Sequence, residues 1–324
     1  MKALLCETHG PAEALVLRDL AEPLPGPGEV VVAVSAAALN FFDTLIIQNR
    51  YQTKPALPFS PSGECAGTIS AIGAGVIGWR VGERVAAWVG HGAAREKIAV
   101  AADAVVRVPD TLDDSQAAGL FVTYGTAMHG LVQRGALRPG ETLAVLGAGG
   151  GAGLAAVEVG ALLGAHVVAC ASSPEKLALA ATHGARDGLD YSREDVKAGL
   201  RRLTDGRGVD LLYDTVGGEL AEPALRAMAW EGRYLVVGFA GGAIPKIPLN
   251  LLLLKSCDLR GVFWGEFTAR EPETHRGNME RLLAWAAVGR IRAHVHRTFP
   301  IERAAEAFAM IGERKALGKI VLTL

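Results

Sequence analysis

The stretch "VLGAGGGAGLAAVEVGALLGA", residues 145–165, places five glycines within seven positions, between an apolar run and a helical pattern. Glycine weakens strands and helices alike, so this density needs a reason. One interpretation is a flexible connector. The other is a turn so tight, and so close to a bound group, that side chains do not fit. The residues on either side of the stretch decide between the two.

The glycines lie between a predicted strand and a predicted helix. "TLAVLG" (142–147) and "HVVACA" (166–171) are typical of strands, and "GLAAVEVGALLG" (153–164) of a helix. In such a unit the pyrophosphate of a dinucleotide rests on the helix N-terminus. The spelling departs from the standard G-x-G-x-x-G, but the flanking pattern favours a phosphate-binding turn over a connector. We therefore expect the cofactor to contact Gly147, Gly150, Gly151, Ala152 and Gly153.

The rest of the chain predicts two kinds of domain. Residues 1–118 alternate short β-like runs with glycine and proline, as in "EVVVAVSAAAL" (29–39), which predicts a mostly antiparallel β domain. From residue 119 strands alternate with helices, which predicts a doubly wound parallel sheet of the α/β class. After "LRGVFWG" (259–265) the pattern is less regular. The chain ends in a predicted strand, "GKIVLTL" (318–324). One interpretation is that this tail rejoins the first domain.

Composition excludes several classes of protein. The 324 residues carry a formal net charge of -1, so no basic surface indicates a nucleic-acid or membrane partner. The four cysteines have no CxxC spacing, which argues against a disulfide framework and favours a reducing compartment. No uncharged apolar run approaches the roughly 20 residues that span a bilayer, and the N-terminus turns polar too early for a signal peptide. We expect a cytoplasmic protein.

The end of the second strand indicates which dinucleotide binds. Enzymes that use NAD place Asp or Glu there to hold the ribose 2′-hydroxyl. This chain has "ACASSPEK" (169–176), with Ser172, Ser173 and Lys176. Hydroxyls and an ammonium suit a 2′-phosphate, so the sequence favours NADPH over NADH. The alternative is that Ser173 only caps a helix and Lys176 is a solvated surface charge.

Seven segments together carry a family resemblance: "LNFFDTLIIQNRY" (39–51), "SGECAGTISAIGAGV" (62–76), "RVGERV" (80–85), "FVTYGTAMHGL" (121–131), "LGAGGGAGLAAVEV" (146–159), "YDTVGG" (213–218) and "LRGVFWG" (259–265). Over essentially its whole length the chain resembles the medium-chain dehydrogenase/reductase superfamily, and more narrowly its zinc-independent quinone oxidoreductases. The resemblance implies a homodimer. It also implies a GroES-like catalytic domain, residues 1–119 and 259–324, around a Rossmann NADPH-binding domain, residues 120–258.

The resemblance also implies roles for individual residues. The nicotinamide ribose and phosphate region would meet Asn40 and Thr126. The 2′-phosphate would be surrounded by Ser172, Lys176, Tyr191 and Arg314, with Ser173 beside them. The nicotinamide would be bordered by Gly238, Phe239, Val262, Phe263 and Trp264, although Trp264 is equally well placed to pack in a subunit interface. Tyr51 matches a tyrosine near the substrate, whereas Leu45 and Ile47 stand where many members have tyrosine and a polar residue.

We expect no metal and assign the catalytic site to Tyr51, Asn40 and Asp43. In zinc-dependent relatives a cysteine and a His-Glu pair occupy the places that are Asn40, Gly63 and Glu64 here, and a catalytic zinc needs about three protein ligands. Asp43 and Glu64 are candidates for polar functional groups near the cleft. The alternative is that both support backbone turns through hydrogen bonds. Cys65 is a reactive thiol or a small packing residue.

The predicted function is an NADPH-dependent reductase of quinones or related conjugated carbonyl compounds. Hydride delivered to a simple ketone leaves a localised alkoxide, for which a metal is valuable. A quinone or enone spreads the incoming charge, so hydrogen bonds and a proton from Tyr51 or water would suffice. The alternatives are a reductase of enoyl-thioester or enone double bonds and a non-enzymatic NADPH-binding protein.

Overall fold

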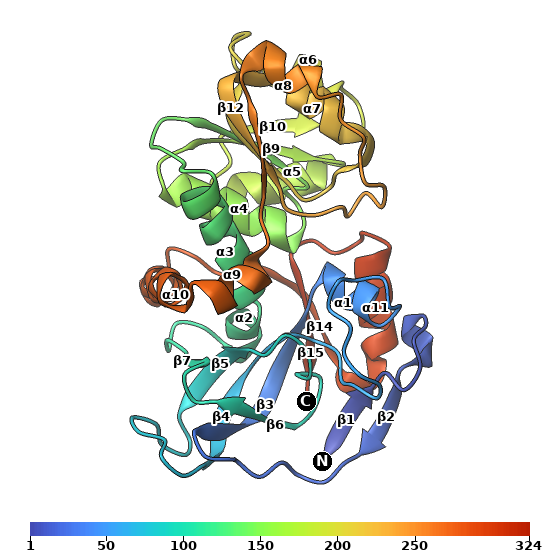
Figure 1. Ribbon diagram of the computed structural model, residues 1–324, viewed down its shortest axis with the longest axis vertical. Helices are drawn as coiled ribbons and strands as arrows, with labels where there is room; N and C mark the ends of the chain where they lie inside the picture. The colour runs from blue at the N-terminus through green and yellow to red at the C-terminus, as the bar shows by residue number, and fades with distance from the viewer. The chain divides into compact units, whose positions relative to one another are not determined.

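The computed structural model of the protein describes all residues, 1–324 (Figure 1). The chain divides into two compact units, one comprising Met1–Val122 with Arg281–Leu324 and the other comprising Thr123–Glu280. No helix has both the length and the apolar character needed to cross a membrane.

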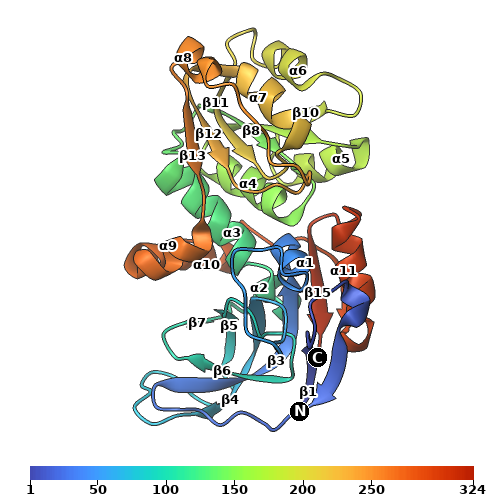
Figure 2. The same cartoon turned by 45° about the vertical axis from the view of Figure 1, so that its right-hand side comes forward.

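The second unit contains a six-stranded sheet in the order β10-β9-β8-β11-β12-β13, and every pairing in it is parallel (Figure 2). The strands are β8 (Thr142–Leu146), β9 (His166–Ala171), β10 (Asp187–Asp190), β11 (Val209–Asp214), β12 (Met228–Val236) and β13 (Asp258–Gly261). The chain runs outward from β8 to β10 and then crosses back to β11. The strand order therefore reverses between β8 and β11, where such sheets bind ligands. The predicted α/β fold is confirmed.

Helices cover both faces of this sheet: α4 (Gly151–Leu162), α5 (Pro174–Thr182), α6 (Val196–Arg202), α7 (Ala221–Arg226) and α8 (Asn250–Lys255), with the short η3 (Gly218–Leu220) before α7. On one face Gly160 of α4 lies directly against Leu143 of β8. On the other face alternate strand residues such as Ala144 and Leu146 form a core with Leu200, Leu225 and Leu251 of α6, α7 and α8. Successive side chains of a strand point to opposite faces, so both layers are apolar, as the near-continuous apolar runs indicated.

The helices that the sequence did not predict include two around and after "LRGVFWG". The residues after "LRGVFWG" form α9 (Trp264–Arg270) and α10 (Pro272–Ala287). The α10 sequence "PETHRGNMERLLAWAA" begins at a proline and contains Gly277 and many polar residues, so its apolar stripe is weak. Before β8, α3 (Phe121–Met128) continues into a π-helix, η2 (His129–Arg134).

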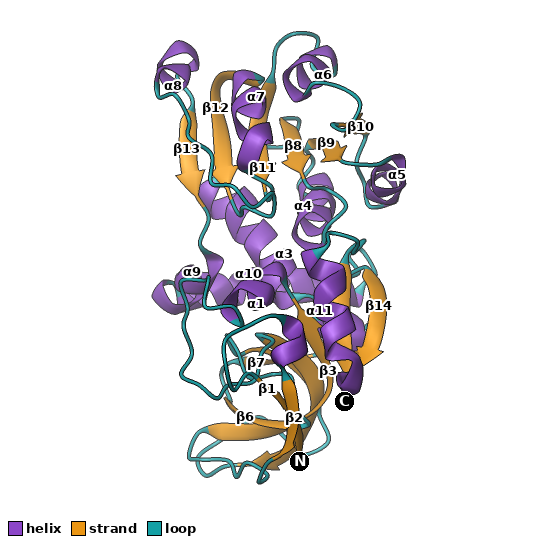
Figure 3. Ribbon diagram, turned by 90° about the vertical axis from the view of Figure 1, so that its right-hand side faces the viewer, coloured by secondary structure: helices purple, strands orange, loops and turns teal.

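The first unit is built on a seven-stranded sheet in the order β14-β15-β3-β4-β5-β7, with β6 also paired to β3. Figure 3 colours the strands orange and labels β3, β6, β7 and β14 of this sheet. Its strands are β3 (Glu29–Leu39), β4 (Glu64–Ile72), β5 (Arg84–Trp88), β6 (Lys97–Ala101), β7 (Val105–Arg107), β14 (Val295–Pro300) and β15 (Lys319–Thr323), beside a separate pair, β1 (Lys2–Leu5) and β2 (Val16–Asp19). The helices are η1 (Ala12–Ala14), α1 (Phe41–Ile46), α2 (Asp114–Ala118), η4 (Ile301–Arg303) and α11 (Ala304–Gly312).

The tail of the chain returns to the first unit through β15. Ile320 pairs with Leu39 in an antiparallel ladder between β15 and β3, and residues 281–324 belong to the first unit. Along the sequence, the boundaries between the compact units fall at 122/123 and 280/281. The predicted domain boundaries were 119/120 and 258/259. The second difference arises because β13 pairs with β12 and so extends the parallel sheet beyond residue 258.

Candidate active site

The glycine-rich turn connects β8 directly to α4. Gly147 has a φ of +81°, a conformation that favours glycine, and its N–H donates to the Cys170 carbonyl oxygen at 3.0 Å. A Cβ on Gly153 would lie 2.7 Å from the Gly147 carbonyl carbon, so the first turn of α4 approaches the strand end as closely as backbone allows. Gly150 is the N-cap of α4, with no side chain between the helix N-terminus and a ligand. The turn is therefore shaped for a phosphate group on backbone N–H groups.

The residues that were predicted to determine the specificity for the dinucleotide lie at and after the end of β9. Ser173 caps α5, accepting from the Lys176 N–H at 3.4 Å. The Lys176 ammonium donates to Ser172 Oγ at 3.0 Å, and its stem lies on Gly149, where a Cβ would be 2.6 Å from Lys176 Cβ. Tyr191 follows the neighbouring strand β10, and its N–H donates to the Ala171 carbonyl oxygen at 3.0 Å. Ser172, Lys176 and Tyr191 therefore lie at the carboxyl ends of two neighbouring strands, β9 and β10.

The residues predicted to border the nicotinamide lie at the ends of β12 and β13. The Gly238 N–H donates to the Asp214 carbonyl oxygen at 3.2 Å, and the Val262 N–H to that of Val236 at 2.9 Å. Phe263 is 48% exposed, whereas Trp264 is buried against α3. There a Cβ on Gly125 would lie 2.7 Å from Trp264 Nε1.

Asp214 supports the turn after β11, and the sequence did not single it out. Its Oδ1 accepts from the Val216 N–H at 2.8 Å and the Gly217 N–H at 2.9 Å, while its Oδ2 accepts from the Tyr234 hydroxyl at 2.5 Å. Burial raises the pKa of Asp214. This turn carries Thr215, which donates to the Leu146 carbonyl oxygen at 2.8 Å, beside the start of the glycine turn. The position of Asp214 within the segment "YDTVGG" (213–218) was the sequence feature that could have indicated this role.

In the first unit, a buried cluster joins three segments that are distant in sequence. Lys319 Nζ of β15 lies 2.7 Å from Glu64 Oε1 of β4 and 2.7 Å from Asn40 Oδ1. Asn40 Nδ2 donates to the same Glu64 oxygen at 2.8 Å, and Glu64 Oε2 accepts from the Val122 N–H at 2.8 Å. The Lys319 and Glu64 side chains are 3% and 0% exposed. Sequence reasoning missed Lys319 altogether.

Asp43 and Tyr51 lie next to this cluster. Asp43 Oδ2 accepts from the Asn40 N–H at 2.7 Å, so the carboxylate caps the start of α1. Burial raises the pKa of Asp43 to about 7, against the lowering effects of the Asn40 N–H and the Lys319 ammonium. The pKa of Tyr51 is raised by burial and then by Asp43, and its ring stacks on Phe42 at 5.6 Å between centroids. The three residues predicted to be catalytic therefore belong to one neighbourhood.

Comparison with known proteins yields relatives along the whole chain. Residues 26–110 match the family described as alcohol dehydrogenase GroES-like domain, and residues 151–285 match the family described as zinc-binding dehydrogenase. A quinone oxidoreductase-like protein 2 homolog of Nematostella vectensis is 36% identical over 99% of this chain and 88% of its own length. A quinone oxidoreductase of Pseudomonas aeruginosa is 34% identical over 99% of both chains.

The chain belongs to the medium-chain dehydrogenase/reductase superfamily, among its quinone oxidoreductase-like proteins. It is therefore an oxidoreductase. The solved quinone oxidoreductase of Escherichia coli, complexed with NADPH, superposes with a TM-score of 0.93 at 26% identity and covers all of both chains. A polyketide synthase subunit of Mycobacterium tuberculosis is 32% identical over 99% of this chain, which spans 15% of that much longer protein.

Three further residues of this oxidoreductase that the sequence singled out are Cys65, Ile47 and Arg314. Cys65 is fully buried, and burial raises the pKa of its thiol to about 12, so it stays protonated and packs in the core. Ile47 is also a core residue, 1% exposed. Arg314 is exposed in the turn after α11, with a φ of +59°.

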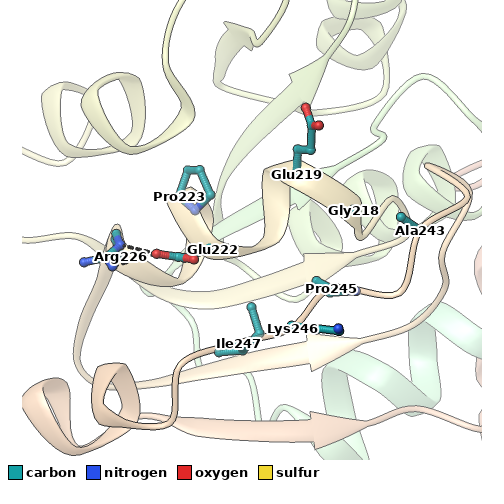
Figure 4. Close-up of a pocket in the computed structure, with 9 residues that line it drawn as sticks. All are labelled: Gly218, Glu219, Glu222, Pro223, Arg226, Ala243, Pro245, Lys246 and Ile247. Atoms are coloured by element: carbon teal, nitrogen blue, oxygen red, sulfur yellow. Dashed lines mark hydrogen bonds and ion pairs between the residues drawn. The ribbon is translucent and has the colours of Figure 1, made fainter.

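Two cavities lie in the second unit of the oxidoreductase. One of about 480 Å³ is lined by η3, α7 and residues 243–247 (Figure 4). Its Arg226 and Glu222 pair with each other at 2.6 Å, and no predicted site residue lines it. The other, of about 260 Å³, is mostly apolar and is bordered by Phe239, Asp214 and Tyr234. No group of three or more His, Cys, Asp or Glu side chains in the chain is arranged to hold a metal ion.

Proposed function

We propose that the protein is an NADPH-dependent reductase that transfers hydride to quinones or related conjugated carbonyl compounds without zinc. The observation that carries the proposal is the pairing of the Lys176 ammonium with Ser172 at 3.0 Å, beside a turn with five glycines in residues 147–153. Where an enzyme specific for NAD needs a carboxylate, this site offers a cation and hydroxyls.

The fit of the cofactor rests on the turn and on the end of β9. The turn from Gly147 to Gly153 would hold the pyrophosphate on backbone N–H groups, and Ser172 and Lys176 would hold the 2′-phosphate. Asp190, the last residue of β10, accepts from the Ser192 hydroxyl at 2.6 Å through its Oδ1. NADPH supplies the hydride when it is bound. The E. coli quinone oxidoreductase, solved with NADPH, supports the same choice for this chain.

A catalytic zinc does not fit the residues of the first unit. Asn40 and Gly63 stand at the two places that have lost the usual ligands. Asn40 Oδ1 and the neighbouring Glu64 Oε1 both accept from Lys319 Nζ at 2.7 Å. A divalent cation at these oxygens would be repelled by the ammonium, and Gly63 has no side chain to add. The reaction therefore needs an acceptor that spreads the incoming charge over a conjugated system, such as a quinone or an enone.

Tyr51 is the proposed proton donor to the reduced acceptor. Its hydroxyl is protonated over the physiological range, because burial and the nearby Asp43 both raise its pKa. Asp43, whose pKa is about 7, is the proposed support for that hydroxyl. Water is the alternative donor, since Tyr51 is only half-buried.

A second candidate is the reduction of the double bond of an enoyl thioester or enone. It uses the same cofactor and also needs no metal, because the charge left by the hydride is conjugated with the carbonyl group. The polyketide synthase relative is the observation that favours keeping this candidate.

We also propose a homodimer, formed through β13. This strand is one of the two edge strands of the six-stranded sheet; the other is β10. An unpaired edge is a template for another strand, and apolar side chains are exposed around it: Leu253 (80%), Leu254 (67%), Leu259 (37%) and Phe263 (48%). Sedimentation of the protein as a single chain of 33.9 kDa at micromolar concentration would contradict the dimer.

The experiment that tests the function is a screen of NADPH oxidation over small quinones, enones and enoyl thioesters. Preference for quinones supports the first candidate, and preference for enoyl thioesters supports the second. Absence of oxidation with every acceptor contradicts both.

A further inference from the structure

We propose that Lys319 is a positioning residue of the reductase, which fixes the Asn40 carboxamide in one orientation through its own bond and through Glu64. The inference rests on the proposed function, since Asn40 is assigned to the cofactor side of that reaction. Neither the glycine motif nor the family resemblance assigned Lys319 a role.

The hydrogen bonds of Asn40 define the orientation. Its Oδ1 accepts from Lys319 Nζ at 2.7 Å, and its Nδ2 donates to Glu64 Oε1 at 2.8 Å. A carboxamide turned by 180° would place its NH₂ group against the ammonium and its oxygen against the carboxylate, losing both bonds. With the ammonium on one side and the carboxylate on the other, the Asn40 carboxamide has a single favourable orientation. We infer that a bound ligand always faces the same atoms of Asn40.

The partners of Asn40 are themselves held in place. Glu64 Oε2 accepts from the Val122 N–H at 2.8 Å, so both carboxylate oxygens are engaged. Lys319 Nζ also donates to the Leu39 carbonyl oxygen at 3.1 Å, which uses its third hydrogen. A Cβ on Gly119 would lie 3.1 Å from Lys319 Cγ, so the absence of a side chain there leaves space for the lysine stem.

Stability alone does not require a lysine at this position. Replacing a buried ion pair by well-packed neutral residues is often neutral or stabilising, because both charges lose hydration on burial. The Lys319–Glu64 pair is more deeply buried than any other ion pair in the chain, at 3% and 0% exposure. A directional role, in which the ammonium orients its neighbours, accounts for a charge that packing does not need.

The charge balance of the neighbourhood gives Lys319 a second effect. Asp43 and Glu64 are two buried carboxyl groups facing one ammonium, with the Tyr51 phenol and the Cys65 thiol as the other titratable neighbours. The Lys319 ammonium lowers the pKa of Asp43, whereas Glu64 raises it. Lys319 therefore offsets the repulsion between the two acids in a site without another cation.

The test compares unaltered protein with Lys319→Met and with the double variant Glu64→Gln/Lys319→Met, which removes both charges together. Lys2→Met is the matched control, because Lys2 forms an exposed pair with Glu302. For each protein, kcat with NADPH and a quinone, the dissociation constant of NADPH and the Tm are measured. We expect both Lys319 variants to lose at least about tenfold in kcat, corresponding to about 1.4 kcal/mol. We expect the double variant to recover the Tm but not kcat, with NADPH affinity within about threefold.

A double-mutant cycle with Asn40→Ala tests whether Lys319 acts through Asn40. In the Asn40→Ala background, removing the Lys319–Glu64 pair is expected to change kcat by less than about twofold. Recovery of kcat together with the Tm in Glu64→Gln/Lys319→Met would overturn the proposal, as would failure of that variant to fold, because either result assigns the pair to structure. If the unaltered protein oxidises NADPH with none of the quinones, enones or enoyl thioesters, the proposed function itself would instead be contradicted.

Discussion

The Lys176 ammonium lies 3.0 Å from Ser172 Oγ, across the junction between the end of β9 and the first turn of α5. The neighbouring Ser173 accepts from the Lys176 N–H at 3.4 Å and so serves as the helix cap. The two serines thus have different tasks. Ser173 stabilises the helix, and Ser172 presents its hydroxyl beside a cation, with the lysine stem held on Gly149.

Lys176→Ala is expected to weaken NADPH binding and leave NADH binding nearly unchanged. A charge-assisted hydrogen bond contributes about 1.5–3 kcal/mol, so the preference for NADPH should fall by roughly ten- to a hundredfold. Isothermal titration with each dinucleotide measures the change, and Lys197→Ala, an exposed lysine on α6, is the control. Equal affinity of the unaltered protein for NADPH and NADH would refute this interpretation of the site.

Gly153→Ala is expected to abolish dinucleotide binding and to lower the free energy of unfolding. The added Cβ would lie 2.7 Å from the Gly147 carbonyl carbon and 2.9 Å from Ala148 Cα, so strand and helix must separate. Overpacking of this kind costs about 1–3 kcal/mol. Gly277→Ala is the matched control, because it lies in α10 with no atom near the new methyl group. It should stabilise the protein by about 0.4–1 kcal/mol, and a destabilisation equal to that of Gly153→Ala would contradict the argument.

Tyr51→Phe tests the proton donor. Removing one central hydrogen-bond donor lowers kcat by about 10²–10³-fold, and NADPH affinity should change little. Loss of the hydroxyl leaves the ring to stack on Phe42, so the Tm serves as the control for packing. A kcat equal to that of the unaltered protein would assign the proton to water and remove Tyr51 from the mechanism.

Chelation tests the proposal that no zinc takes part. Activity should survive prolonged dialysis against a chelator, and metal analysis should find well below one zinc per chain. The physical reason is the Lys319 ammonium, which already uses the Asn40 and Glu64 oxygens. Stoichiometric zinc whose removal abolishes turnover would contradict the proposal.

The sequence predicted the parts of the fold that depend on local patterns. The glycine turn, the strands around it and the Ser173 cap were all predicted, because each depends on residues within a few positions of one another. α10 was missed, since its polar face dominates and Gly277 interrupts the helical pattern.

The buried cluster could not be predicted in the same way. Lysine is rarely buried, so Lys319 in "GKIVLTL" resembles a solvated residue at the start of a strand. Its partners Glu64 and Asn40 are 255 and 279 residues away in sequence. Only the pairing of β15 with β3 brings them together.

The most direct test of the central claim is the rate of cofactor oxidation by the purified, chelator-treated protein with a small quinone. The account predicts rapid oxidation of NADPH and oxidation of NADH slower by about tenfold or more at equal concentration. It also predicts no detectable NADP-linked oxidation of simple primary alcohols, because the proposed site has no zinc to lower the pKa of an alcohol. Efficient primary-alcohol oxidation by this metal-free protein, with no activity toward quinones or enones, would contradict it.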